Sequence, residues 1–135
     1  MKIVLDSNIL LVALGQRSEY APIWQAFIDK AYQLVVTEDI IFEYTEILQQ
    51  RSAIGMADLI LDVFIESSSV LYQQVYYNWN LIKDPDDNKF FDAAVAANVD
   101  YLVTNDKHFN TVKSLKFPPV NVVTGKEFLA ILSRT

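Results

Sequence analysis

The stretch that decides the fold of this chain is residues 84–106, "DPDDNKFFDAAVAANVDYLVTND". Asp84 followed by Pro85 is typical of a helix start, because aspartate caps free N–H groups and proline fits the first helical position. Apolar residues then recur at helical spacing for several turns, and "YLVT" (101–104) follows as a short apolar run. The stretch therefore predicts a helix that leads into a buried strand, and that strand stops on an acid, Asp106.

The same alternation of helices and short apolar runs continues along the whole chain. The first run, "KIVL" (2–5), also stops on an acid, Asp6. Alternating strands and helices predict an α/β fold with a parallel sheet. We expect a single domain (1–135) with three layers, in which a central sheet of four to five strands is flanked by helices. Strands are expected at 2–5, 33–37, 70–75, 101–104 and 120–124, and helices at 8–15, 19–31, 38–50, 53–66, 84–98 and 125–132, the last opened by a Thr124–Glu127 capping box.

Composition limits the kinds of function. The chain has no cysteine, which excludes disulfides and thiolate zinc sites. Its net charge of −6, from 11 basic and 17 acidic residues, argues against a broad basic surface for nucleic acid. It leaves open an enzyme that meets phosphates through bound cations. No apolar stretch approaches the length of a membrane span, so we expect a cytoplasmic protein.

Helix geometry separates the acids of residues 84–98. With a turn of about 100° per residue, Asp87 falls in the middle of the apolar stripe that includes Phe90 and Phe91. Asp84 falls toward the same face, whereas Asp92 lands on the far side. An acid centred on an apolar face is unusual. For Asp87, a solvated acid at the helix start and an inward-facing site acid both remain open; for Asp84, a helix cap is the simpler interpretation.

Three more acids are ambiguous one by one. In the helix 38–50, Glu43 lies nearest the apolar stripe and is by itself a boundary residue. Asp6 and Asp106 could each be a helix cap. Taken with Asp87, however, they come from separated segments whose strand ends and helix starts can converge in a parallel sheet. Carboxylates that close together repel one another unless a cation neutralises them, and magnesium or manganese suits oxygen ligands.

These segments resemble the PIN domain, a family of metal-dependent ribonucleases. The resemblance rests on "IVLDSNILLVAL" (3–14), "IIFEYTEIL" (40–48), 84–106 and "VVTGKEFL" (122–129), which span nearly the whole chain. Residues 84–106 are the most specific of these. They are similar to the subfamily of toxin components of toxin–antitoxin systems.

The resemblance implies a metal-dependent endoribonuclease that hydrolyses phosphodiester bonds. It implies Asp6, Glu43, Asp87 and Asp106 as catalytic residues, and Asp6, Asp87 and Asp106 as ligands of Mg²⁺ or Mn²⁺. The implied substrate is single-stranded or structured RNA, and the implied partner is a small basic antitoxin protein. A homodimer is a further candidate assembly.

Several neighbouring residues receive weaker interpretations. Asp84 is a candidate outer contributor to the site, and whether Asp92 contributes stays open. Asn8 and Thr104 could orient the carboxylates through hydrogen bonds without contacting the metal themselves. His108 is interpreted as an exposed loop residue rather than a metal ligand.

Two rival functions remain. The chain could be a receiver-like, non-catalytic module that binds a metal or phosphate, with Lys126 after the last strand, although Glu43 is then unexplained. It could also be a catalytically silent interaction protein, which a complete acid set disfavours. The aromatic segment "VYYNWN" (75–80) is expected in an exposed loop. There, packing of Tyr77 and Trp79 is favoured over stacking on RNA bases.

Overall fold

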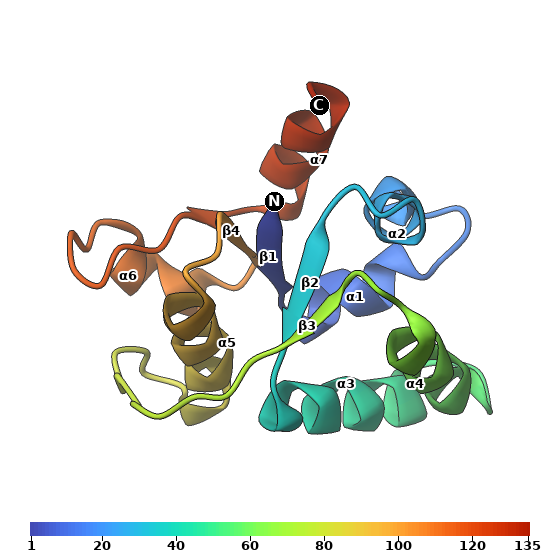
Figure 1. The fold of residues 1–135 in the computed structure, drawn as a ribbon, viewed down its shortest axis with the longest axis horizontal. Helices are drawn as coiled ribbons and strands as arrows, with labels where there is room; N and C mark the ends of the chain where they lie inside the picture. Colours follow the sequence, from blue (N-terminus) through green and yellow to red (C-terminus); the bar gives the residue numbers. More distant parts are fainter.

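The computed structural model describes all residues 1–135, and one five-stranded sheet lies at its centre (Figure 1). Every neighbouring pair of strands is parallel, and the order across the sheet is β3-β2-β1-β4-β5. The strands are β1 (Lys2–Leu5), β2 (Gln33–Val36), β3 (Val70–Tyr72), β4 (Tyr101–Val103) and β5 (Val122–Val123).

Seven α-helices and one 3₁₀ turn flank this sheet. In Figure 1, α5 and α6 lie to the left of the strands, and α1, α2 and α4 lie to the right. The helices are α1 (Ser7–Ala13), α2 (Ala21–Ile28), α3 (Glu38–Arg51), α4 (Met56–Glu66), α5 (Pro85–Ala97), α6 (Asn110–Lys113) and α7 (Gly125–Ser133), with the 3₁₀ turn η1 at Lys107–Phe109. The predicted α/β fold with a parallel sheet is confirmed. No helix is both long and apolar enough to cross a membrane.

Tyr44 ties helix α3 to the central strand. Its ring is fully buried and packs near Phe64 and Phe90, and its hydroxyl donates to the carbonyl of Leu5 at 2.6 Å. A buried hydroxyl needs such a partner, because an unpaired one costs free energy. The contact fixes α3, and with it Glu43, next to the carboxyl end of β1.

The ends of most elements follow the sequence expectations. Asp84 caps α5 by accepting from the backbone N–H of Asp86 at 3.0 Å, and Thr124 and Glu127 form the expected capping box. Several elements are shorter than expected: β3 ends at Tyr72, where the chain leaves the sheet, β5 is only Val122–Val123, α2 is Ala21–Ile28, and α4 begins at Met56. The sequence did not indicate η1 or α6, since both are too short to show a periodic pattern.

Asp92 was expected on the far side of its helix, away from the apolar stripe, and that side proves to be buried as well. Asp92 is 5% exposed, because the segment after β3 covers this face of α5 and the backbone N–H of Trp79 donates to its carboxylate at 3.1 Å. Helix α5 also contacts β1, β2 and β4. It is therefore covered on both faces, which a single helical stripe could not reveal.

Strand order separates the fold from the receiver-like alternative. Here β1 lies between β2 and β4. In flavodoxin-like receiver domains the first strand lies between the second and the third. The order places a topological switch point between β1 and β4, and ligands bind at such points beyond the carboxyl ends of the strands.

Gly125 allows helix α7 to approach the start of α2. A methyl group at this position would lie 2.5–2.7 Å from atoms of the Tyr20 ring, which is closer than packed atoms tolerate. We expect Gly125→Ala to lower the free energy of unfolding by about 1–3 kcal/mol through overpacking. Gly15→Ala is the matched control, because its nearest contacts would be ordinary, at 3.4–3.5 Å. Urea unfolding curves measure both; equal stability of the two variants would contradict the prediction.

Candidate metal and active site

Two adjacent parallel strands end in a shared hydrogen-bond system. The hydroxyl of Thr104, after β4, donates to Asp6 Oδ2 at 2.6 Å and accepts from the backbone N–H of Asp106 at 3.0 Å. Asp6 follows β1, and its own N–H donates to the carbonyl of Val103 at 3.0 Å. The ladder between β1 and β4 thus sets Asp6, Thr104 and Asp106 side by side.

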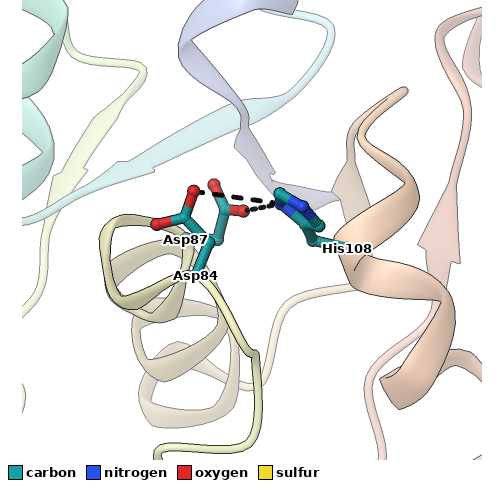
Figure 2. A group of neighbouring side chains, drawn as sticks. All are labelled: Asp84, Asp87 and His108. Carbon is teal, nitrogen blue, oxygen red and sulfur yellow. Dashed lines mark hydrogen bonds and ion pairs between the residues drawn. The ribbon is translucent and has the colours of Figure 1, made fainter.

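Helix α5 brings a third acid to the same place. His108 Nδ1 lies 3.0 Å from Asp87 Oδ2 and 3.3 Å from Asp106 Oδ1, so these two carboxylates are neighbours across one imidazole. Asp84 Oδ2 lies 3.9 Å from the same nitrogen. In Figure 2, Asp84 and Asp87 from the start of α5 face His108 from the turn after β4.

Glu43 lies on α3 and is held from two sides. Ser7 Oγ donates to Glu43 Oε2 at 2.5 Å, and Lys89 Nζ lies 2.9 Å from Glu43 Oε1. Both partners stand close to site acids in the sequence: Ser7 follows Asp6, and Lys89 lies on α5 two positions after Asp87. These contacts connect Glu43 to the starts of α1 and α5.

The crowding of acids changes their protonation. The pKa of Asp87 is raised to about 6, chiefly by burial, and the negative charges of Asp106, Asp84 and Asp6 contribute to that rise. The hydrogen bond from His108 works in the opposite direction. Burial also raises the pKa of Asp6, although two hydrogen bonds oppose the rise. The hydrogen bond to Asp87 raises the pKa of His108. Partly desolvated carboxylates at this spacing store repulsion that a cation would relieve.

The most compact set of ligand atoms is not the set expected from sequence. One oxygen each from Asp84 and Asp87 and one ring nitrogen of His108 lie within 4.8 Å of one another. Asp6 and Asp106 are joined to this set through Thr104 and the imidazole. A cation shared by Asp87 and Asp106 would compete with His108 Nδ1 for the space between them.

Sequence reasoning missed three polar partners in this site. His108 was interpreted as an exposed loop residue; its side chain is half exposed, but it contacts three carboxylates. Its position two residues after Asp106, inside a single 3₁₀ turn, was the only local signal. Ser7 and Lys89 gave none, because their contacts to Glu43 join residues 36 and 46 positions apart.

Comparison with known proteins finds similarity to one family and to solved structures. A family model described as PIN domain matches residues 2–108. A chain of VapBC2 from Rickettsia felis, solved bound to a DNA fragment from its promoter, is 18% identical, with a TM-score of 0.64 over 92% of this chain and 98% of that chain. VapC20 from Mycobacterium tuberculosis, a sarcin–ricin loop cleaving toxin, is 12% identical, with a TM-score of 0.58 over 87% and 99%. No match is found among curated proteins.

The raised pKa of Asp87 predicts a pH-dependent stability of the metal-free protein. The folded state holds this proton up to about pH 6, whereas the unfolded chain releases it near the ordinary aspartate pKa of 3.8. Stability therefore falls as pH rises through this window, and the raised pKa of His108 acts in the same direction above it.

Asp87→Asn should remove most of this dependence and stabilise the metal-free protein at about pH 7.5 by roughly 1 kcal/mol, a value reduced for solvent screening. Melting temperatures in chelator between about pH 5 and pH 8 measure the effect. Asp86→Asn is the control, because Asp86 is exposed and lies outside the acid cluster, which is formed by Asp6, Asp84, Asp87 and Asp106. Parallel pH curves for the wild type and Asp87→Asn would contradict the prediction.

Proposed function

The chain belongs to the PIN domain family, and from that premise we propose that it is a metal-dependent endoribonuclease. The single observation that carries the proposal is the meeting of acids from β1, β4 and α5 around Thr104 and His108. Acids that gather at the carboxyl ends of parallel strands repel one another, and a bound cation would relieve that repulsion. Such a place is also where α/β proteins bind ligands.

The donor set fits a hard divalent cation. Asp6, Asp87 and Asp106 offer carboxylate oxygens, the ligand type that Mg²⁺ and Mn²⁺ prefer. We propose that these three residues hold the ion, with Mg²⁺ or Mn²⁺ as the physiological metal. When bound, the ion would position the scissile phosphate, lower the pKa of a water molecule and stabilise the leaving oxygen.

The protein's own groups would prepare the site for this chemistry. Thr104 donates to one oxygen of Asp6 and so orients its carboxylate. Glu43, fixed between Ser7 and Lys89, would accept a proton or hold a water molecule beside the phosphate. An imidazolium at His108 would balance part of the negative charge when no other cation does.

We further propose that the protein is the toxin of a toxin–antitoxin pair that acts in the cytoplasm. The support is the resemblance of residues 84–106 together with the fold shared with a chain of VapBC2 and with VapC20. An RNA strand, single or structured, would be the substrate. A small basic protein would suit the net charge of −6, and a homodimer is a candidate assembly.

Divalent metal should raise the melting temperature. A ligand that binds only the folded state stabilises it by mass action, by about 2.7 kcal/mol at a hundred times its dissociation constant. We expect a rise in Tm with millimolar Mn²⁺ or Mg²⁺ in the wild type and in Asp86→Asn, and little rise in Asp6→Asn. Differential scanning fluorimetry measures it. An unchanged Tm in the wild type would exclude a preformed metal site.

Cleavage should require both the metal and Asp87. Purified protein with Mn²⁺ or Mg²⁺ should cut RNA internally, chelator should stop the reaction, and Asp87→Asn should lower the rate by at least about a hundredfold, as expected for loss of a metal ligand. Asp86→Asn should stay within about twofold of the wild type, because surface substitutions of this kind change little. Gel analysis of end-labelled RNA measures the rates. Metal-dependent stabilisation without any cleavage would instead favour the non-catalytic binding module.

The antitoxin proposal has a separate test. The product of a small open reading frame beside the gene, expressed with the protein, should copurify with it and suppress cleavage. A gene without such a neighbour, or a neighbour whose product leaves cleavage unchanged, would remove the antitoxin and leave the ribonuclease proposal standing.

A further inference from the structure

A second cavity lies at the same edge of the sheet as the acid cluster. It has a volume of about 640 Å³ and is formed by the ends of β2 and β3, the start of α3, the segment after β3, and α5. This volume lies within the range of small-molecule sites. A larger cavity of about 900 Å³ lies between α1, α2 and α7, but none of the cluster acids lines it.

Lys89 connects this cavity to the site already described. It lines the cavity, and its ammonium group lies 2.9 Å from Glu43 Oε1. Its charge is therefore already paired. A group seated in the cavity would therefore lie beside the Lys89–Glu43 pair, and Glu43 is joined through Ser7 to the start of α1, next to Asp6.

The charges of the cavity do not suit a phosphate. Glu38 and Asp39 in the first turn of α3 line it, together with the buried Asp92. Asp92 is 5% exposed, and its carboxylate accepts a single hydrogen bond, from the backbone N–H of Trp79 to Oδ1, so its second oxygen is free to accept another. Acceptors gathered in this way call for a ligand that carries N–H donors.

Planar and amide groups complete the lining. Tyr72 and Tyr76 are 60% and 88% exposed and offer aromatic faces for stacking. Gln73, Gln74 and Asn78 add amides that can donate and accept. Aromatic faces beside amides and carboxylates form the combination that reads single-stranded bases, by stacking and by hydrogen bonds to their edges.

We propose that this cavity is a nucleobase subsite for the RNA strand and that it selects a base with an exocyclic amino group over uracil. Amino groups of adenine, cytosine and guanine donate to carboxylates, whereas the exocyclic oxygens of uracil would face them as a second set of acceptors. The subsite rests on the proposed ribonuclease function and adds a base preference to it. It also gives the exposed Tyr72, at the end of β3, and Tyr76, after it, a role that the acid cluster does not.

Binding measured without cleavage tests the subsite. The probes are uridine octamers that carry one internal adenosine, cytidine or guanosine, with the all-uridine octamer as reference, and the protein is Asp6→Asn so that the RNA stays intact. We expect the amino-bearing octamers to bind more tightly. Tyr76→Ala should weaken them about tenfold, the range of one lost base stack. Tyr76→Phe, which keeps the ring, should restore binding.

Two matched controls separate the subsite from general effects. Tyr77 is 65% exposed and next in sequence but does not line the cavity, so Tyr77→Ala should leave the base preference unchanged. Asp39→Asn should reduce the difference in affinity between the amino-bearing octamers and the all-uridine octamer. Asp58→Asn, at the equivalent first turn of α4, should leave that difference unchanged. Equal affinity for all four octamers, or equal effects of Tyr76→Ala and Tyr77→Ala, would overturn the proposal.

Mononucleotides distinguish failure of the subsite from failure of the nuclease. In backbone NMR spectra, AMP, CMP and GMP should shift the signals of residues 73–78 more strongly than UMP does. Shifts there in a protein that cleaves no RNA would support the subsite and contradict the ribonuclease proposal. Metal-dependent cleavage with no such shifts and no base preference would support the ribonuclease proposal and contradict the subsite.

Discussion

The parallel pairing of β1 with β4 is the constraint on which the rest of the site depends. Its register sets Leu5 opposite Val103, so the next residues, Asp6 and Thr104, leave the sheet together. The 2.6 Å hydrogen bond between their side chains then holds a desolvated carboxylate in one orientation. Because Asp106 donates its N–H to the same threonine, one hydroxyl positions both strand-end acids.

Further acids lie around this pair, and nearby basic side chains balance part of their negative charge. Lys89 pairs with Glu43, and His108 stands among Asp84, Asp87 and Asp106. The pKa of Asp87 is raised because burial and the neighbouring negative charges still disfavour its ionised form. A site that stays strained when empty gains the most from a cation, which is how a chain with net charge −6 could still meet a phosphate backbone.

Three of the acids serve the backbone and the site at once. Asp6, Asp84 and Asp106 each cap the helix or turn that follows them, through bonds to Asn8, Asp86 and His108 N–H groups. Capping and site membership, which compete as interpretations of a single residue, are therefore compatible in space. A cap uses one carboxylate oxygen and fixes the direction in which the other points.

The sequence by itself determined the order of the main elements, the parallel α/β class and the inward position of Asp87, because these follow from local periodicity and capping chemistry. It could not place Asp92, which is buried by a covering loop, nor the contacts of Glu43 with Ser7 and Lys89. Nor did it indicate that His108 contacts three carboxylates. Each of these depends on segments far apart in the chain meeting in space, and side-chain contacts of that range leave no periodic trace. Only the tertiary structure decided which oxygens share one space, because strand order and helix docking, not spacing, bring them together.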